Sequence, residues 1–225
     1  GGGIIAGIAV AAKGINPNIK IVGVQTANIP SMQESMKNGE VTTAFKSTTI
    51  ADGIAVKTPG DMTFEIIKEL VDEVVLVEEE EIAQGIVYLM ENLKVVAEGS
   101  GAVTTAALLS GKYAPKENEN VVCIISGGNV DVNNLYRIIG SGLAKEGRRY
   151  SFSVTMIDKP GGFSELTKII SENNANILNA NQSRLSSGAY IGKQNAEFVL
   201  ETFDNEHIQK IKSDIEAAGF EIKDL

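Results

Sequence analysis

Three glycine-containing junctions carry the residues of this sequence whose types and spacing could bind a ligand. The first is Gly1-Gly2-Gly3, directly before residues 4–12, which have the small apolar side chains of a packed helix. Successive glycines expose backbone N–H groups, and a helix N-terminus adds the positive end of its dipole. The loop is therefore a candidate cradle for a lone phosphate, with an ordinary tight turn as the alternative. The pattern is not Gly-x-Gly-x-x-Gly, which disfavours a dinucleotide.

The second junction is Ser126-Gly127-Gly128-Asn129, which follows the continuous apolar run of residues 121–125. Such a run predicts a buried strand, and in open α/β sheets ligands bind beyond the carboxyl ends of the strands. The Ser126 hydroxyl can face a ligand nitrogen there, and the two glycines let the backbone come close. The structural alternative is a strand-to-helix turn in which Asn129 or Asp131 caps the next helix.

The third junction is Glu98-Gly99-Ser100-Gly101-Ala102, again before a helix of small residues. Its simplest interpretation is structural, with Ser100 as the N-cap and Gly101 allowing close helix packing. Three such junctions within one domain nevertheless favour a ligand site over three unrelated turns.

The segments that must position these junctions alternate between helix-like and strand-like patterns over residues 3–145. This alternation predicts a mostly parallel sheet covered by helices. Asp61 is the expected cap of its helix, and the acidic run of residues 78–81 suits the positive end of a helix dipole as a solvated helix start. We expect helices over residues 4–13, 30–38, 61–70, 78–91, 101–109 and from about 131, and strands over 19–24, 73–77 and 121–125.

A charged break at residues 144–149 predicts a domain boundary, which divides the chain into residues 1–147 and 148–225. Beyond it the pattern changes to the order βαββαβ of a ferredoxin-like unit. The loop between its middle strands contains Gly188 and Gly192. We expect strands over residues 150–157, 175–184, 194–203 and 220–225, and helices over 163–172 and 205–218.

The composition excludes several classes of protein. A net charge of −9 argues against a nucleic-acid binder, which needs a basic face. The single cysteine, Cys123, cannot form an internal disulfide, and the single histidine, His207, provides no cluster for zinc and fits a solvated helix surface. No apolar run is long enough for a membrane-spanning helix, so neither a membrane nor a nucleic acid is an expected partner.

Five motifs follow one another along the chain in a fixed order. They are Gly1-Gly2-Gly3-Ile4-Ile5-Ala6-Gly7-Ile8-Ala9, Val22-Gly23-Val24-Gln25, Thr49-Ile50-Ala51-Asp52-Gly53-Ile54-Ala55-Val56, Glu98-Gly99-Ser100-Gly101-Ala102 and Ser126-Gly127-Gly128-Asn129. With these motifs the chain resembles the serine/threonine dehydratase family of pyridoxal-phosphate enzymes, which have the tryptophan-synthase-β-like fold. Within that family it is similar, over essentially all 225 residues, to threonine ammonia-lyases that carry one C-terminal ACT domain. The resemblance implies an α/β fold made of a partial cofactor-domain sheet, lacking its N-terminal part, and a ferredoxin-like ACT domain.

The resemblance also implies roles for individual residues toward pyridoxal 5'-phosphate. The glycine loop would hold the cofactor phosphate, Ser126 would hydrogen-bond the pyridine nitrogen, and Asp52 would lie near the site, with a structural or a substrate-side role. A neutral hydroxyl at the pyridine nitrogen favours β-elimination over transamination. The implied cofactor-binding residues are Gly1, Gly2, Gly3, Glu98, Gly99, Ser126 and Gly127.

The implied reaction is the conversion of L-threonine to 2-oxobutanoate and ammonia, by a carbon–nitrogen lyase. The family's Schiff-base lysine and its substrate loop lie upstream of the glycine loop, so we expect the chain to start inside a larger domain and to hold no catalytic residue of its own. Gln25 and Ser31 stand where relatives with a divalent cation have acidic residues, so no metal is carried over. A catalytically inert amino-acid sensor and an L-serine dehydratase remain alternatives.

Residues 158–163, Asp-Lys-Pro-Gly-Gly-Phe, resemble the ACT signature between a first strand and a first helix. The resemblance implies that the backbone amides of Gly161 and Gly162 meet the carboxylate of an amino-acid effector, isoleucine or else valine. Asn179, within residues 176–181 of the second strand, would lie on the edge facing a second copy. We therefore expect a cytoplasmic homo-oligomer, a dimer or a tetramer, that takes an amino-acid substrate and an amino-acid effector.

Overall fold

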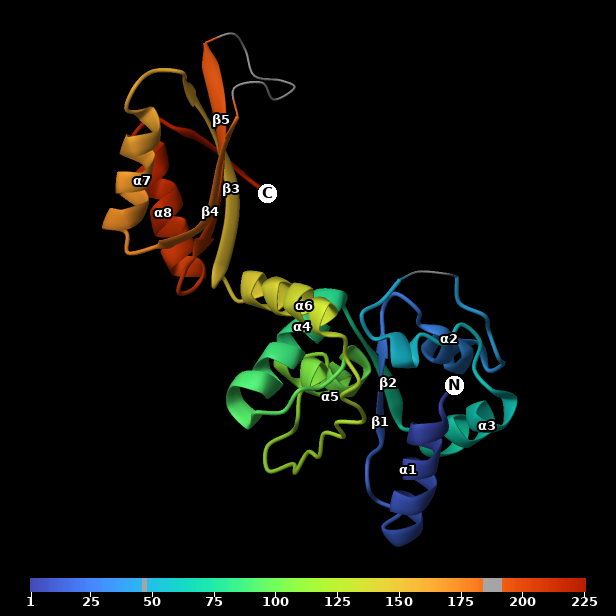
Figure 1. Ribbon diagram of the computed structural model, residues 1–225. Coiled ribbons are helices and arrows are strands. Elements are labelled where there is room, and N and C mark those ends of the chain that lie inside the picture. The colour runs from blue at the N-terminus through green and yellow to red at the C-terminus, as the bar shows by residue number, and fades with distance from the viewer. Residues whose placement is uncertain (46–47, 184–191) are drawn as a thin grey trace. The chain divides into compact units, whose positions relative to one another are not determined.

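The computed structural model describes residues 1–45, 48–183 and 192–225, which divide into two compact units, Gly1–Gly142 and Leu143–Leu225 (Figure 1). The first unit contains α1 (Gly3–Ile15), β1 (Val22–Thr26), α2 (Ser31–Asn38), η1 (Asp52–Ile54), α3 (Asp61–Leu70), β2 (Glu73–Val77), α4 (Glu79–Tyr88), η2 (Leu89–Leu93) and α5 (Gly99–Leu109). Helix α6 (Val132–Lys145) follows, and its last three residues belong to the second unit. None of the described helices is both long enough and apolar enough to cross a membrane.

The first unit is organised around the parallel pair of strands β1 and β2, in which Val24 lies opposite Val75. Helices α1 and α3 lie on one side of this pair and α4 and α5 on the other (Figure 1). Successive side chains of β2 point to opposite sides of the strand pair and so contribute to both cores. Val74 packs against the cluster around α1 and α3, whereas Val75 packs against the cluster around α4 and α5. The predicted parallel sheet with helical cover is therefore confirmed.

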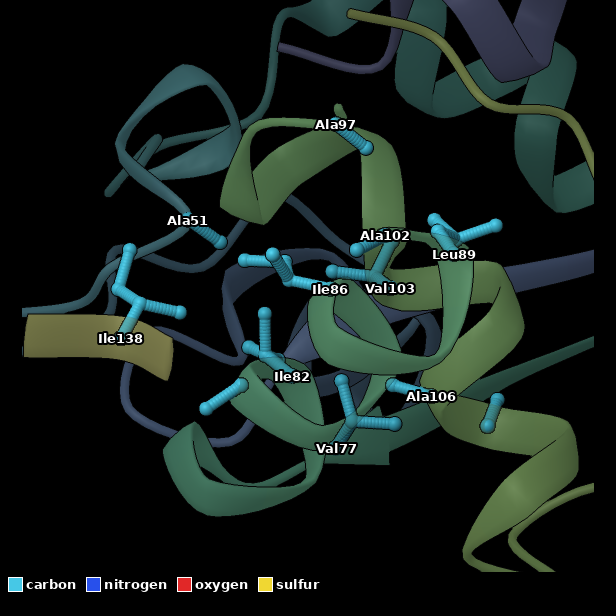
Figure 2. Packing of buried hydrophobic residues seen from close by; sticks show 12 residues of the cluster. Ala51, Val77, Ile82, Ile86, Leu89, Ala97, Ala102, Val103, Ala106 and Ile138 are labelled. Atoms are coloured by element: carbon cyan, nitrogen blue, oxygen red, sulfur yellow. The ribbon is translucent and has the colours of Figure 1, made fainter. Parts of the chain in front are cut away.

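The main core of this unit lies where α4 packs against α5. Figure 2 shows Ile86 of α4 beside Ala102 and Val103 of α5. The helices come close because small residues face each other: a Cβ atom on Gly85 would lie 3.1 Å from the carbonyl oxygen of Ala102. This tight packing fixes the start of α5, and with it the Glu98-Gly99 junction.

The predicted strand over residues 121–125 is wrong, since these residues form no strand in the structure. Val122 is 81% exposed, and the Ile124 carbonyl accepts a hydrogen bond from the Thr104 hydroxyl at 3.1 Å instead of from a neighbouring strand. A strand needs a partner for its backbone groups. Among the described residues of this unit, only β1 and β2 pair.

Two helix starts differ from their prediction in detail. Gly60, with an extended backbone, is the N-cap of α3, so Asp61 is not the cap but the first helical residue, where its charge still faces the positive end of the dipole. Glu78 is the N-cap of α4 and forms a capping box with Glu81, whose carboxylate accepts a hydrogen bond from the Glu78 amide at 2.8 Å.

The second unit has the predicted βαββαβ order, with its antiparallel strands arranged β4-β5-β3-β6. Helices α7 and α8 cover one face of this sheet (Figure 1). The core beneath them is aromatic: Phe198 stacks on Phe152 at 5.5 Å and on Phe163 at 5.4 Å between ring centroids. The elements are β3 (Arg149–Ile157), α7 (Gly162–Glu172), β4 (Asn176–Ser183), β5 (Lys193–Glu201), α8 (Asn205–Ala217) and β6 (Glu221–Asp224).

Strand β4 is an edge of the sheet and pairs only with β5 among the described strands, with an irregularity between Ile177 and Asn179. Gly192, the turn residue directly before β5, has a φ of 86°, and its carbonyl accepts a hydrogen bond from the Asp158 amide at 2.9 Å. Gly188, in the predicted loop before it, lies outside the described residues.

His207 is more than a solvated surface residue. Its Nδ1 atom accepts a hydrogen bond from the Phe203 amide at 3.1 Å, so the neutral ring donates from Nε2 to the Asn173 carbonyl at 2.7 Å. The ring also stacks on Phe203, with centroids 4.7 Å apart. His207 therefore ties the start of α8 to the turn after α7.

Candidate functional site

The glycine loop begins the first unit. Gly2 is the N-cap of α1 with a left-handed φ of 91°, which favours glycine, and a Cβ atom there would lie 2.8 Å from Ile67 Cδ1. The helical ladder starts with the Ala6 amide donating to the Gly2 carbonyl, so the amides before it are free of intrahelical partners. A Cβ atom on Gly3 would meet nothing within 4 Å. The loop thus presents an open helix N-terminus, as the sequence predicts.

Glu98, the N-cap of α5, holds the second ligand junction in place. Its amide donates to the Gly127 carbonyl at 3.1 Å, and one carboxylate oxygen accepts from the Asn129 amide at 3.2 Å. Its other carboxylate oxygen would lie 2.3 Å from a Cβ atom on Gly127. The structure therefore brings together Glu98, Gly99, Ser126 and Gly127, with Ser126 exposed.

The glycines around this junction are explained by three close backbone approaches. A Cβ atom on Gly99 would lie 2.2 Å from the Ile50 carbonyl oxygen, and one on Gly101 would lie 2.4 Å from that of Gly127. A Cβ atom on Gly128 would lie 2.8 Å from the carbonyl oxygen of Val96. Residues 49–53, 96–101 and 126–129 can therefore pass one another only because these positions lack side chains.

Residues 51–56, which include η1, lie between the two junctions. At one end, a Cβ atom on Gly53 would lie 2.8 Å from the hydroxyl oxygen of Ser100 and 3.5 Å from a carboxylate oxygen of Glu98. At the other end, Val56 packs on Gly1, where a Cβ atom would lie 2.7 Å from Val56 Cγ1. Both junctions therefore rest on one short segment. Asp52, the first residue of η1, is exposed within it.

Ser100 is not the N-cap of α5, because Glu98 has that position and Ser100 lies within the helix. Its hydroxyl oxygen is buried and has no hydrogen-bond partner within the described part of the chain. The side chain of Ser100 packs against Gly53, where a Cβ atom would lie 2.8 Å from its hydroxyl oxygen.

Gln25 and Ser31 form a buried, neutral network at the end of β1. The Gln25 side-chain amide donates to the Ser31 hydroxyl at 3.2 Å, and the hydroxyl donates to the Val56 carbonyl at 2.6 Å. The Gln25 carbonyl oxygen accepts from the Met32 amide at 3.2 Å and from the Gln33 amide at 3.3 Å, at the start of α2. Across the described residues, no group of three or more His, Cys, Asp or Glu side chains could hold a metal ion.

In the second unit, Gly161 is the N-cap of α7 with a left-handed φ of 95°, and a Cβ atom there would meet nothing within 4 Å. Gly162 begins the helix and is buried. Asn179 is exposed on the edge strand β4, where it pairs with Val199. The predicted effector residues thus lie on two elements, a helix N-terminus and a sheet edge.

Glu79 is a residue that the sequence analysis missed. It was part of an acidic run interpreted as a solvated helix start, yet its carboxylate accepts hydrogen bonds from the Thr26 hydroxyl at 3.0 Å and the Ile50 amide at 2.6 Å. Nothing in the local pattern distinguishes it from the exposed Glu80. Its partners lie 53 and 29 positions away along the chain, and only the fold brings them to it.

Known families match both units. The model of the family "Pyridoxal-phosphate dependent enzyme" matches residues 1–127, and that of the "ACT domain" matches residues 150–220. An L-threonine ammonia-lyase of Thermotoga maritima is 45% identical over 223 residues, which are 99% of this chain and 55% of that protein. The chain thus spans about half the length of this relative.

Solved structures agree with the first match. The processed form of threonine deaminase isoform 2 from Solanum lycopersicum has a TM-score of 0.57 and 36% identity, covering 62% of this chain and 41% of that one. A maize serine racemase has a TM-score of 0.56 and 35% identity, and the match covers 64% of this chain and 45% of the racemase chain. The resemblance noted in the sequence is therefore confirmed. The chain belongs to the family of pyridoxal-phosphate-dependent enzymes, and its residues 150–220 match an ACT domain.

Proposed function

We propose that the gene product containing this chain is an L-threonine ammonia-lyase, which converts L-threonine to 2-oxobutanoate and ammonia. One observation carries the proposal: residues 51–56 join the open helix N-terminus at Gly3 to the Glu98–Ser126 junction, in a chain 45% identical to an L-threonine ammonia-lyase over 223 residues. The two junctions together have the chemistry that pyridoxal 5'-phosphate needs, namely free amides for a phosphate and a neutral hydroxyl for a ring nitrogen.

The residues present fit this cofactor. The amides before Ala6 have no intrahelical partner and Gly3 is exposed, so the glycine loop could hold the phosphate. Ser126 is exposed and would hydrogen-bond the pyridine nitrogen, and Gly127, Glu98 and Gly99 would contribute to the same side of the cofactor site. When bound, the cofactor supplies an electron sink for elimination at the substrate's β-carbon. A neutral hydroxyl at Ser126 would leave the ring nitrogen largely unprotonated, which would favour elimination over transamination.

The experiment compares the complete gene product with the 225-residue chain. We expect the complete product to form 2-oxobutanoate from L-threonine and to show the visible absorbance of lysine-bound cofactor. We expect the 225-residue chain to be inactive, since no lysine in it has the family's Lys-x-Arg-Gly context. L-Serine is assayed in parallel, because faster turnover of serine would replace the proposal with a serine dehydratase. A complete product that binds amino acids without turnover would support the inert sensor instead.

We propose further that residues 148–225 are a regulatory domain, divided from the catalytic residues 1–147, and that they bind isoleucine, or else valine. The left-handed Gly161 leaves open space at the N-terminus of α7, where the backbone amides of Gly161 and Gly162 can donate hydrogen bonds to an amino-acid carboxylate. This N-terminus forms only one wall of a pocket. The exposed edge strand β4, with Asn179 on it, supports the pairing of two copies, which would supply the other wall.

Sedimentation of the 225-residue chain with and without each amino acid, together with calorimetric titration, tests this regulatory role. Binding and pairing should strengthen each other, because each copy completes the site of the other. Failure of both amino acids to bind, or binding to a strict monomer, would refute the proposal. We place the enzyme in the cytoplasm as a dimer or tetramer, in keeping with the single free thiol of Cys123.

A further inference from the structure

We propose that Glu79 is a positioning residue for the candidate active site, an inference that rests on the proposed function. Its carboxylate fixes residues 50–53 against the start of α5, and thereby fixes the side of the site that contains Glu98 and Ser126. Within the described part of the chain, the Glu79 carboxylate accepts hydrogen bonds from Thr26 and Ile50 and from no proposed cofactor-binding residue.

The first step is that the Glu79 carboxylate joins two segments that are distant in sequence. One oxygen accepts a hydrogen bond from the Thr26 hydroxyl at 3.0 Å, at the end of β1. The other accepts one from the Ile50 amide at 2.6 Å. Thr26 is fully buried and Glu79 is half-buried, so this hydrogen bond is partly shielded from competing water. Hydrogen bonds to an ionised acceptor are the stronger kind.

The second step is a relay of hydroxyl groups that strengthens the same connection. The Thr49 hydroxyl donates to the Thr26 hydroxyl at 3.2 Å, and the Thr26 hydroxyl in turn donates to Glu79. The Thr49 oxygen accepts from the Ala51 amide at 3.1 Å. The amides of Ile50 and Ala51 are therefore both held by a network that ends on the Glu79 carboxylate.

The third step leads from Ile50 to the site. Gly99 passes so close to Ile50 that a Cβ atom on it would lie 2.2 Å from the Ile50 carbonyl oxygen, and Gly53 lies against Ser100 and Glu98 in the same way. Residues 50–53 therefore have no room to move toward α5, and the hydrogen bond to Glu79 stops them from moving away. Misplacement of a site by about 1 Å can cost about 100-fold in rate.

Capping of α4 does not explain these contacts. Glu78 and Glu81 already form the capping box, and Glu80 supplies a further negative charge to the first turn. Glu80 is exposed, whereas Glu79 is half-buried and directs its carboxylate to Thr26 and Ile50. Glu80→Ala is therefore a matched control, because it removes the same charge from the same helical turn without disturbing residues 50–53.

Hydrogen exchange of the 225-residue chain measures the positioning directly. In Glu79→Ala, the amides of Ile50 and Ala51 should exchange about 10-fold faster or more, since the Ile50 amide loses its acceptor and the Thr49 relay loses its end point. Glu80→Ala should leave them unchanged. Glu79→Gln keeps one acceptor oxygen but loses the other acceptor and the charge, so it should raise exchange less than Glu79→Ala but still above the parent. If Glu79→Ala does not fold, this intermediate rise is the test, and exchange in Glu79→Gln equal to that of the parent would overturn the proposal. Equal exchange in Glu79→Ala and Glu80→Ala would overturn the proposal.

Kinetics and spectra of the complete gene product connect this positioning to the site. Glu79→Ala should lower kcat roughly 10-fold to 100-fold while KM changes little, and it should alter the circular dichroism of the bound cofactor. Glu80→Ala should match the parent in both. If the parent shows no lyase activity, the proposed function fails, and hydrogen exchange with the cofactor spectrum still decides the role of Glu79. An unchanged spectrum and kcat in Glu79→Ala would refute it.

Discussion

A Cβ atom on Gly101 would lie 2.4 Å from the carbonyl oxygen of Gly127, so the first turn of α5 and the Ser126-Gly127-Gly128-Asn129 junction touch through bare backbone. No side chain larger than hydrogen fits between them. The position of Ser126 is therefore set by contact with α5 rather than by strand pairing, because residues 121–125 form no strand.

Gly101→Ala should destabilise the first unit by about 1–3 kcal/mol, because the added methyl group meets backbone that cannot rotate away. Chemical denaturation measures the change. Gly7→Ala is the matched control: Gly7 also lies within a helix, but a Cβ atom there meets nothing within 4 Å. That substitution should be stabilising by about 0.5–1 kcal/mol, and equal effects of the two substitutions would contradict the close approach.

Gln25→Leu should destabilise the first unit by about 2 kcal/mol or more, since it leaves the buried Ser31 hydroxyl and the amides of Met32 and Gln33 short of partners. Urea denaturation of the purified chain provides the measurement. Lys37→Ala is the control, because Lys37 is an exposed residue of α2, the helix that contains Met32 and Gln33. It should change the free energy of unfolding by less than about 0.5 kcal/mol. A loss for Gln25→Leu no larger than for Lys37→Ala would show that the network contributes little.

Ser126→Ala in the complete gene product should reduce kcat/KM by about 10-fold to 100-fold, the loss of one hydrogen bond to the cofactor. Because Ser126 is exposed, the free energy of unfolding should stay the same. Steady-state kinetics and cofactor titration are the measurements, with the exposed Ser213→Ala as control. Unchanged kcat and cofactor affinity would remove Ser126 from the site.

Asp224 should make the second unit sensitive to acid. The Lys212 ammonium, which donates to it at 2.8 Å, and the Tyr150 hydroxyl, which donates at 2.6 Å, lower the pKa of the Asp224 carboxyl. A lowered pKa contributes stability above the pKa of the unfolded carboxyl, about 3.9, and this contribution is lost as pH falls through the folded-state pKa. Asp224→Asn should therefore lose stability at neutral pH and match the parent in strong acid.

The hydrogen bond between Tyr150 and Asp224 gives the opposite pH dependence in alkali, where stability falls as pH rises. Burial, and then the hydrogen bond to Asp224, raises the pKa of Tyr150, so its contribution is present below about pH 10 and is lost above it. Denaturation of parent and Asp224→Asn across this range is the measurement, with the exposed Glu197→Gln as control. A constant difference between parent and variant at every pH would contradict the assignment.

The sequence predicts those parts of the fold that depend on local patterns. The strand over residues 73–77 has the predicted bounds, because its alternation serves two helical layers at once. The βαββαβ order of the second unit is also confirmed, since it contains every partner that its strands need. The apolar run of residues 121–125 has the same local signal as a strand but no partner among the described residues, and here the prediction failed.

The candidate site was predictable where glycines mark it and unpredictable where polar side chains reach across the fold. Glycine patterns indicated Gly2 and Gly161, and both have the left-handed backbone that such junctions require. Gln25 was noted only as a position without an acidic ligand, although it organises the start of α2. Contacts of this kind depend on tertiary packing, which no local periodicity encodes.

The buried clusters have a consequence for how the chain melts. The aromatic cluster around Phe152 and Phe198 is made of residues 150–222, whereas the other two clusters are made of residues 5–138. Cooperativity in unfolding comes from shared burial. The aromatic cluster should therefore unfold as one cooperative unit, and the two clusters of residues 5–138, which lie on the two sides of β1 and β2, as another. A calorimetric scan of the chain is then a sum of transitions, its van't Hoff enthalpy falls below its calorimetric enthalpy, and no single Tm describes it.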